Sequence, residues 1–447
     1  MTDLNINFHK YQQVMDHFNP IKSIGEVKKL VGIIIESRGP ACSIGELCEI
    51  YPAGYSKPIS AQVVGFQEEN ILLMPFGDIG GIKAGSRVVS HQRLPMVNVG
   101  RELLGRVIDG LGNPLDGKED YRIENEYSLY NPALKPFERE RIREVLPTGI
   151  RAIDVLLTIG KGQKVGIFSG SGVGKSTTLG MIARNTGADI NVIALIGERG
   201  KEVREFIENN LGTEGLSRSV IIAATSELPA LVRIRAAFMA TSISEFFRDL
   251  GQDVLLMMDS ITRFAMAQRE IGLAIGEPPS SRGYTPSVFT LLPKLMERTG
   301  KSIKRGSITS LYTVLVEGDD INEPISDASR SILDGHIVLT RDLANSTHYP
   351  PIDILMSNSR AMMDIVDEEH IKYANKLKEL LAAYKDAEDL VNIGGYVTGR
   401  NKKIDFVINK KETIDSFLKQ GIKEKTDIFQ AKKQLFEIVK EYESVPI

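Results

Sequence analysis

The sequence is poor in the residues that build disulfide-linked or membrane-embedded folds. It has no tryptophan, and Cys42 and Cys48 are its only cysteines among 447 residues. Two cysteines in so long a chain form no disulfide framework, which excludes a disulfide-stapled scaffold and indicates a reducing compartment. No segment approaches the run of about 18 apolar residues that a membrane-spanning helix requires. The first residues include Asp3, His9 and Asp16 and lack the apolar core of a secretory signal, so we expect a cytoplasmic protein.

A strong excess of either charge is also missing. The formal net charge is -3 at pH 7, so the chain has no general attraction to nucleic acid or to anionic lipid. The hydrophobic fraction of 42% and the charged fraction of 25% are typical of a globular protein. A chain of this length predicts roughly two to four domains.

The first 20 residues carry apolar side chains at alternating spacings of four and three. Such spacing places them in one stripe along a helix, which Pro20 would end. Two interpretations stay open: the helix packs on its own chain or frays, or it docks onto a partner or a membrane surface. The stripe consists of Leu4, Phe8, Tyr11, Met15 and Phe18.

Short β-rich runs separated by turn residues lie between residues 25 and 95 and predict a small barrel or sandwich. After a turn-rich connector at residues 109–118, residues 150–345 alternate strand-like apolar runs with helical patterns. This alternation predicts βαβ units around a mostly parallel, buried sheet, and hence an α/β fold. From about residue 365 onward, helical patterns with mixed charges predominate. The predicted strands include Val27–Glu36, Val165–Phe168, Ile190–Ile196, Val220–Ala223, Val254–Met258 and Ile308–Leu315, and the predicted helices include Leu228–Leu250 and Ser260–Ile271.

A glycine-rich loop stands between a predicted strand and a predicted helix. Its residues run Ser169-Gly170-Ser171-Gly172-Val173-Gly174-Lys175-Ser176-Thr177. Glycines let the backbone curl so that successive N–H groups face one phosphate, and the helix N-terminus adds a favourable dipole. Lys175 would neutralise the β and γ phosphates, and Ser176 would bind Mg²⁺ through its hydroxyl. The strict pattern has glycine where Ser169 stands, and a plain structural turn is the alternative, but the context favours binding of a nucleoside triphosphate with magnesium.

Two carboxylates follow neighbouring predicted strands. Asp259 ends an apolar strand, which would deliver its charge to the sheet edge where the magnesium lies. The alternative is that Asp259 caps the helix beginning at Ser260. Glu198, after the strand that ends at Ile196, would polarise a water molecule towards the γ-phosphate. Its alternative is a surface salt bridge with Arg199.

Several residue strings in a fixed order resemble the family of rotary-type hexameric ATPases, which includes the catalytic subunits of F-type ATP synthase. Within that family, the chain most resembles the export ATPases of the bacterial flagellum and of related type III secretion systems, and Gly283–Leu292 supports this branch. The resemblance covers about residues 25–440. The strings are Gly170–Ser176, Gly197–Glu202, Asp259–Arg263, Gly276–Pro279, Leu333–His336 and Ser357–Arg360.

The resemblance implies a subunit with an N-terminal β-barrel, a RecA-like P-loop nucleotide domain and a C-terminal helical domain. We expect an N-terminal partner segment at residues 1–24, the barrel at 25–95, the nucleotide domain at 96–365 and the helical domain at 366–447. Small residues in place of the first glycine of the loop are typical of the export branch, so Ser169 weakens neither fold nor catalysis.

The resemblance also implies roles for individual residues. Glu198 matches the catalytic glutamate, and Arg263 matches an arginine close to the phosphates. Tyr349 matches an aromatic that packs on the adenine of ATP, although a tyrosine that merely packs in the core or on the surface is the alternative. Arg360 matches an arginine finger that enters the neighbouring subunit's site, with an intrachain salt bridge as the alternative. The remaining matches are Lys175 at the phosphates and Ser176, Glu202 and Asp259 around Mg²⁺ and its waters.

These matches predict an ATPase that hydrolyses Mg-ATP to energise flagellar protein export. The partners implied are identical subunits in a homohexamer, a regulatory protein at the N-terminus, and export-apparatus proteins with their substrates and chaperones. The location implied is the cytoplasm, with peripheral contact at the inner face of the cell membrane. A virulence-type secretion ATPase stays an alternative.

Three other functions compete with export. A rotary synthase or ion-pump subunit would carry an acidic loop near the C-terminus, and the run Asp386–Leu390 is a weak and shorter candidate. An RNA translocase would need a basic surface interleaved with aromatics, which residues 25–95 lack, so we expect no nucleic-acid partner. A non-catalytic scaffold subunit would not need Glu198.

Overall fold

A computed structural model describes residues 23–444 apart from residues 53, 55, 56, 120–122, 124, 304, 317, 319 and 321. The apolar stripe predicted within the first 20 residues lies outside the described residues. The chain divides into two compact units, residues 1–95 and residues 96–447, and each is described by itself.

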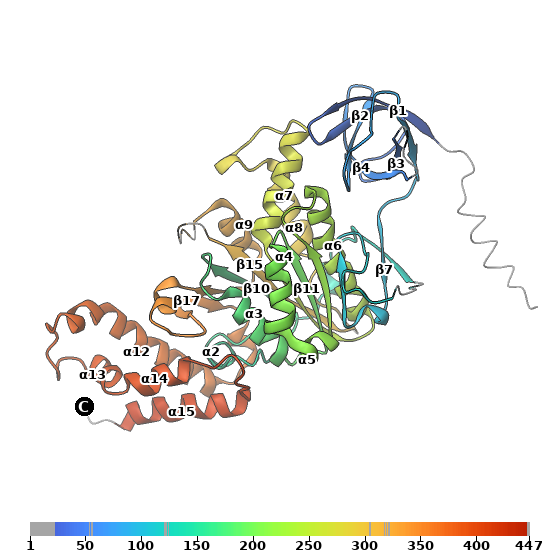
Figure 1. The fold of residues 1–447 in the computed structure, drawn as a ribbon. Coiled ribbons are helices and arrows are strands. Elements are labelled where there is room, and N and C mark those ends of the chain that lie inside the picture. The colour runs from blue at the N-terminus through green and yellow to red at the C-terminus, as the bar shows by residue number, and fades with distance from the viewer. Residues whose placement is uncertain are drawn as a thin grey trace, which may run out of the picture. The chain divides into compact units, whose positions relative to one another are not determined.

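The first unit is a closed six-stranded barrel, shown in blue in Figure 1. Its strands all pair antiparallel and follow the order β1-β2-β5-β4-β3-β6. Alternate residues along a strand, such as Cys48 and Ile50 or Ile71 and Leu73, belong to the buried core of the barrel, which is the period of two that a half-buried strand requires. The strands are β1 (Ile24–Val31), β2 (Ile34–Arg38), β3 (Leu47–Tyr51), β4 (Ile59–Gln67), β5 (Asn70–Pro75) and β6 (Arg87–Ser90).

One predicted strand of the barrel was wrong. The run Val27–Glu36 folds as a hairpin and not as one strand, because Gly32 turns the chain with a positive φ of 59°. Glycine alone lacks the Cβ that makes this backbone conformation costly.

The second unit is built on a sheet whose central strands are parallel. The order is β17-β16-β10-β15-β13-β11-β12-β8, and only β17 and the short β14 run antiparallel to their neighbours. The central strands are apolar and buried along their whole length, as a sheet covered on both faces requires. The strands are β8 (Arg106–Asp109), β10 (Lys164–Ser169), β11 (Ile190–Ile196), β12 (Ser219–Ala224), β13 (Asp253–Asp259), β14 (Gly300–Lys301), β15 (Ser307–Leu315), β16 (Gly335–Leu339) and β17 (Ile352–Ser359).

Helices follow these strands and bring the chain back to the next one, as a sheet of parallel strands demands (Figure 1). The predicted strands between residues 165 and 315 are confirmed within one or two residues. Sequence patterns missed β8, β16 and β17, which are short or interrupted by polar residues. The helices are α2 (Arg151–Leu156), α3 (Lys175–Asn185), α4 (Gly200–Glu205), α5 (Gly212–Ser217), α6 (Ala230–Asp249), α7 (Ile261–Ala274), α8 (Pro286–Met296), α9 (Pro324–Ile332) and α10 (Arg341–Asn345), and a π-helical turn, η3 (Phe206–Leu211), follows α4. A small ribbon of β7 (Met96–Val99) and β9 (Asn125–Ser128) stands apart from the sheet.

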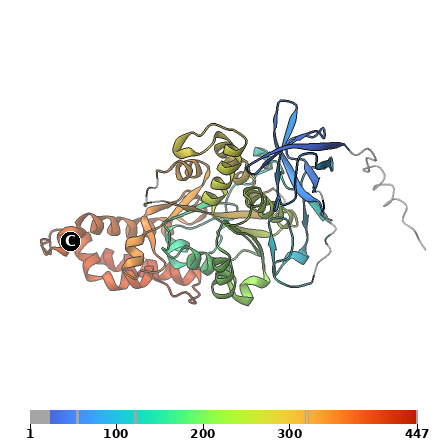
Figure 2. The same cartoon turned by 45° about the horizontal axis from the view of Figure 1, so that its top comes forward.

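The C-terminal part is helical and packs through α2 on the sheet of the second unit (Figure 2, red). Tyr373 and Leu377 share one apolar core with Ile153 and Leu156 of α2. Two hydrogen bonds reinforce the contact: the backbone N–H of Arg151 donates to Gln420 Oε1 at 2.8 Å, and His370 Nε2 lies 2.8 Å from the carbonyl oxygen of Val155. The helices are α11 (Met362–Ile365), α12 (Glu368–Asn392), α13 (Lys402–Asn409), α14 (Lys411–Leu418) and α15 (Ile428–Ser444).

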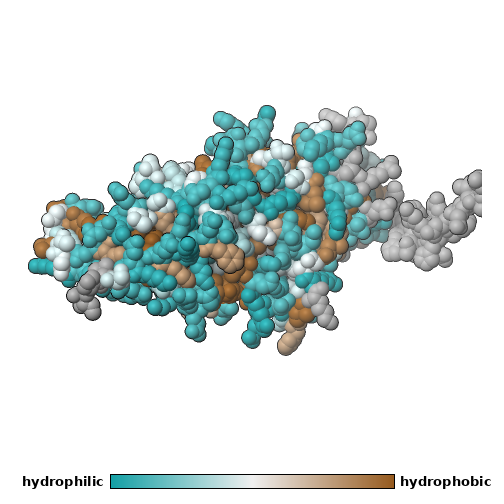
Figure 3. All heavy atoms as spheres, turned by 90° about the horizontal axis from the view of Figure 1, so that it is seen from below, coloured by the Kyte–Doolittle hydropathy of each residue, from teal (hydrophilic) through white to brown (hydrophobic). Residues whose placement is uncertain are grey.

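Within the part of the chain that the structure describes, no helix combines the length and the apolar character that crossing a bilayer requires. Hydrophilic residues predominate on the face that Figure 3 shows, with hydrophobic residues interspersed among them.

Candidate nucleotide site

The glycine-rich loop connects the carboxyl end of β10 with the start of α3. Gly172 and Gly174 have φ values of 77° and 102°, which let the loop curl before the helix begins at Lys175. The loop lines a cavity of about 630 Å³ at the carboxyl edge of the parallel strands, where α/β folds bind ligands. The cavity is lined by Gly170, Ser171, Gly172, Gly174, Lys175, Ser176 and Thr177 of the loop and by Gly197, Glu198, Arg199, Glu202, Glu205, Asn210, Ser226, Arg263 and Leu315.

Lys175 joins two carboxylates from neighbouring strands. Its Nζ lies 2.5 Å from Asp259 Oδ1, at the end of β13, and 3.2 Å from Glu198 Oε1, just after β11. Burial alone would lower the pKa of the lysine, but the negative charges of Asp259 and Glu198 raise it, so the side chain stays an ammonium ion. The order of the parallel strands therefore brings together the lysine predicted at the phosphates, the aspartate predicted at the magnesium and the glutamate predicted to orient the attacking water.

The same oxygen of Asp259 also accepts a hydrogen bond from a residue that the sequence analysis missed. Thr313 on β15 donates its hydroxyl proton to Asp259 Oδ1 at 2.7 Å. Asp259 does not cap the next helix, because Ser260 accepts the hydrogen bond from the N–H of Arg263 instead. Thr313 lies inside a predicted strand, and no pattern in the sequence distinguishes it from its neighbours.

Glu198 is largely buried beside the loop. Burial raises the pKa of its carboxyl to about 7, the nearby charge of Asp259 adds to the rise, and Lys175 opposes it. The alternative pairing with Arg199 is absent among the described residues, since Arg199 instead lies 3.7 Å from Glu202. A carboxyl that titrates near neutral pH is suited to exchanging a proton with water.

Arg263 supplies a second cation to the same cavity. Its Nε is buried without a hydrogen-bond partner, and within residues 23–444 as described no carboxylate pairs with its guanidinium. A buried, unpaired donor of this kind calls for an anion. The backbone of Gly197, with a φ of 70°, passes so close that a Cβ there would lie 2.9 Å from the Cβ of Arg263.

Tyr349 lies beside the loop at Gly174. A Cβ added to Gly174 would lie 3.7 Å from Cε1 of the tyrosine ring. The ring is 47% exposed and lines a second cavity of about 700 Å³. Tyr349 thus lies beside the glycine-rich loop, and its packing on the adenine stays a prediction. The sequence analysis did not find the C-terminal residues that complete the cavity: Glu412, Asp415, Ser416, Lys419, Gln420, Gly421 and Glu424.

Arg360 does not line the cavity beside the glycine-rich loop of its own chain. It follows Ser359, which pairs with Gly335, and Gly335 pairs with Val165 near the amino end of β10. The loop begins at Gly170, five positions further along that strand, or about 17 Å away at the rise of a parallel strand. No carboxylate pairs with Arg360 among the described residues, so the alternative of an intrachain salt bridge finds no support in the described geometry.

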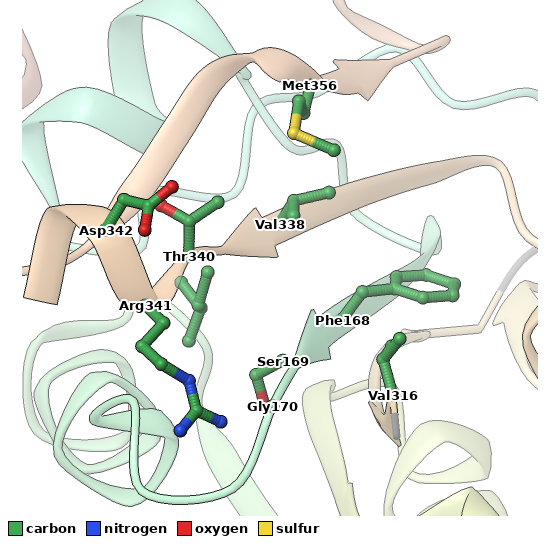
Figure 4. A pocket seen from close by; sticks show the side chains of 10 residues that line it. Phe168, Ser169, Gly170, Val316, Val338, Thr340, Arg341, Asp342 and Met356 are labelled. Carbon is green, nitrogen blue, oxygen red and sulfur yellow. The ribbon is translucent and has the colours of Figure 1, made fainter. Parts of the chain in front are cut away.

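Ser169 and Val173 are the two residues of the loop that do not line the cavity containing Lys175. Val173 is buried in the core. The hydroxyl of Ser169 is buried with no hydrogen-bond partner among the described residues, and Ser169 lines a separate, mostly apolar cavity of about 190 Å³ together with Val338, Arg341 and Met356 (Figure 4). None of Lys175, Glu198 and Asp259 reaches this cavity.

The donor set fits a magnesium ion that is bound mainly through a nucleotide. In the described part of the chain, no three His, Cys, Asp or Glu side chains gather to hold a metal by themselves. Mg²⁺ usually takes one or two carboxylates together with phosphate oxygens and water. Ser176 and Glu202 line the cavity beside the glycine-rich loop, and Asp259 pairs with Lys175, which also lines it.

Three family models match successive parts of the chain. The β-barrel domain of the ATP synthase alpha/beta family matches residues 27–91, and its nucleotide-binding domain matches residues 149–359. The C-terminal domain of the T3SS EscN ATPase matches residues 366–437. These matches confirm the order of barrel, nucleotide domain and C-terminal domain.

Individual relatives match almost the whole chain. The flagellum-specific ATP synthase of Bacillus subtilis (strain 168) is 56% identical over 404 residues, which are 90% of this chain and 92% of the relative. The assembled ATPase EscN of the enteropathogenic E. coli type III secretion system has a similar structure, with a TM-score of 0.88 and 45% identity over 93% of this chain and 100% of EscN. EscN in complex with its central stalk EscO gives a TM-score of 0.86 and 44% identity, with 93% and 100% coverage.

Proposed function

We infer the function from family membership: the chain belongs to the ATP synthase alpha/beta family and, within it, to the flagellum-specific and type III secretion ATPases. It is an ATPase of type III protein export. We propose that it serves the flagellar apparatus, because the flagellum-specific relative of Bacillus subtilis is 56% identical, whereas the type 3 secretion system ATPase of Xanthomonas euvesicatoria is 48% identical.

The reaction that we propose is hydrolysis of ATP to ADP and phosphate. The support for it is the convergence of Lys175, Glu198 and Arg263 on one loop-lined cavity. The loop amides and Lys175 hold the β and γ phosphates, and Arg263 adds a second positive charge. Ionised Glu198 accepts a hydrogen bond from a water molecule and aims it at the γ-phosphate.

Mg²⁺ would be held by Ser176, Asp259 and the phosphates, with Glu202 oriented towards its waters. When bound, the ion neutralises the charge that develops on the phosphate oxygens. Asp259 is already oriented for this role by Thr313. Tyr349 packs on the adenine of ATP, and the C-terminal residues of the cavity beside it form the opposite wall.

We propose that the chain acts as a ring of six identical subunits. Arg360 is too far from its own loop to assist hydrolysis, whereas an arginine finger acts on a neighbour's nucleotide. The assembled state of EscN supports this arrangement. Within each subunit, we propose a barrel at residues 25–95, a nucleotide domain at 96–365 and a helical domain at 366–447.

The remaining proposals concern partners and place. The complex of EscN with its stalk EscO supports a comparable stalk partner for this chain. We propose that residues 1–24 bind a regulatory protein or the export apparatus, and that the protein works in the cytoplasm with peripheral contact at the inner face of the membrane. A truncation lacking residues 1–18 should lose the partner in a pull-down while it keeps ATP turnover, and retention of the partner would contradict the assignment.

Phosphate release by the purified full-length chain with Mg-ATP tests the central proposal. Lys175→Ala should show no hydrolysis. Glu198→Gln should bind a fluorescent ATP analogue as tightly as the parent chain but turn over about 100-fold or more slowly, because the amide cannot accept the proton. Glu208→Gln, at an exposed glutamate paired with Arg204, is the matched control. Undiminished turnover of Glu198→Gln would remove its proposed role.

A further inference from the structure

Two further arginines share a cavity with Arg360. Arg141 and Arg143 line a hollow of about 590 Å³ together with Arg360, Ile142 and Asp364. All three arginines are exposed. Within the residues that the structure describes, no nitrogen of the three lies within ion-pair distance of a carboxylate. Three guanidinium groups around one hollow, none of them neutralised by a partner, form a strong local attraction for an anion.

The segment that carries Arg141 and Arg143 is held in place at both ends. On one side, the N–H of Glu140 donates to the carbonyl oxygen of Lys301 at 3.0 Å. On the other side, the N–H of Leu146 donates to the carbonyl oxygen of Ile159 at 2.8 Å, and that of Lys161 to Glu144 at 2.8 Å. The two arginines are two residues apart with the half-buried Ile142 between them, so this anchored segment presents both to the same hollow.

Glu140, Asp334 and Asp364 also line the hollow, but among the described residues none of them forms an ion pair with the three arginines. Glu140 lies 3.4 Å from Lys301, and Glu144 on the same segment lies 2.7 Å from Lys301 and 3.1 Å from Lys161. Asp334 accepts the backbone N–H of Lys164 at 3.0 Å. Asp364 lines the hollow without an ion pair. Lysines thus neutralise the acids of this segment and leave the arginines available.

We propose that Arg141 and Arg143 act together with Arg360 on the triphosphate bound by the neighbouring copy of the chain. This proposal rests on the proposed ring and deepens it: the surface that enters the neighbour's site is a group of three arginines and not a single finger. The neighbour's cavity holds Glu198, Glu202 and Glu205 beside Lys175, Arg199 and Arg263, so its own cations are matched by its acids, and positive charge from across the interface would favour the triphosphate.

The decisive variant is the double change Arg141→Ala with Arg143→Ala in the full-length chain. We expect kcat to fall roughly 10- to 100-fold, which corresponds to the loss of one charge-assisted hydrogen bond, with melting temperature unchanged. Arg360→Ala serves as the positive control. Arg400→Ala removes an exposed arginine that lines neither cavity and should keep full turnover. Unchanged kcat in the double variant would overturn the proposal while leaving ATP hydrolysis itself intact.

Mixed rings test whether the arginines act across the interface. The double variant keeps Glu198, and Glu198→Gln keeps Arg141 and Arg143, so a mixture contains interfaces with every group in place. Turnover of the mixture above that of either variant alone is expected. Absence of such recovery would mean that the arginines act within their own subunit and would overturn the assignment.

A last measurement separates phosphate from the neighbour's carboxylates as the anion. Light scattering of the double variant without nucleotide should show the same assembly as the parent chain. Weaker assembly without nucleotide would mean that the arginines pair with carboxylates of the neighbouring subunit, which would contradict the proposal. Arg141→Lys with Arg143→Lys should recover part of the turnover, because lysine restores the charge but not the bidentate geometry.

Discussion

Lys175 Nζ lies 2.5 Å from Oδ1 of Asp259, two side chains that are 84 residues apart in the sequence. The contact exists because β10 and β13 both flank β15 and end at the same edge of the sheet. The lysine thereby neutralises a carboxylate that is otherwise buried, and Glu198 shares the same ammonium group. A nucleotide with Mg²⁺ would redistribute these contacts, because the phosphates attract the lysine and the metal attracts the acid.

The hydroxyl of Thr313 fixes the orientation of Asp259. Thr313→Val removes the 2.7 Å hydrogen bond at nearly constant volume, so we expect the Mg²⁺ concentration for half-maximal turnover to rise roughly tenfold. Titration of phosphate release with Mg²⁺ measures this shift. Thr313→Ser keeps the hydroxyl and should behave like the parent chain, and equal metal dependence of Val and Ser would contradict the role.

Hydrolysis should depend on pH through Glu198. The raised pKa of about 7 leaves this carboxyl largely protonated below neutrality in the nucleotide-free protein. The protonated form cannot take up a proton from the attacking water, so kcat/KM should fall about tenfold per pH unit below 7 and level off above it. Binding of an ATP analogue across the same range is the control. A kcat/KM that stays constant between about pH 5.5 and about pH 8 would contradict the assignment.

Tyr349 should contribute to ATP binding and not to the chemical step. Tyr349→Ala removes the exposed ring beside the loop, and loss of base stacking worth about 1–3 kcal/mol should raise KM roughly 5- to 150-fold with kcat little changed. Tyr349→Phe keeps the ring and should keep KM. Steady-state kinetics measured over a range of ATP concentrations distinguish the two variants. An unchanged KM in Tyr349→Ala would mean that Tyr349 does not pack on the adenine.

Gly197 should tolerate no side chain. An alanine there would need a φ of 70° and would place its Cβ 2.9 Å from Arg263, so Gly197→Ala should lower the free energy of unfolding by roughly 1–2 kcal/mol and displace Arg263. Gly200→Ala is the matched control. Gly200 is the first residue of α4, and no atom of its surroundings lies within 4 Å of a Cβ added there. Denaturant unfolding of both variants checks the difference, and equal stability would show that the backbone at Gly197 relaxes easily.

Local order along the chain determined much of the site. The phosphate cradle proposed for the loop from Gly170 to Ser176 consists of consecutive backbone groups, so neighbouring residues in the sequence suffice to predict it. The apolar runs that form β10, β11 and β13 likewise predicted a buried parallel sheet. They also predicted the edge of that sheet at which Glu198 and Asp259 lie.

Only the tertiary structure decided the relationships between distant segments. The hydroxyl of Thr313 on Asp259, the C-terminal wall opposite Tyr349, and the distance of Arg360 from its own loop all depend on strand order and register. The three-arginine group has the same origin, since Arg141 and Arg143 reach Arg360 only through the anchoring of their segment on residues 159–161 and 301. The physical reason is that a side chain's type and spacing report its local backbone, whereas its partners are set by which surfaces the whole chain buries together.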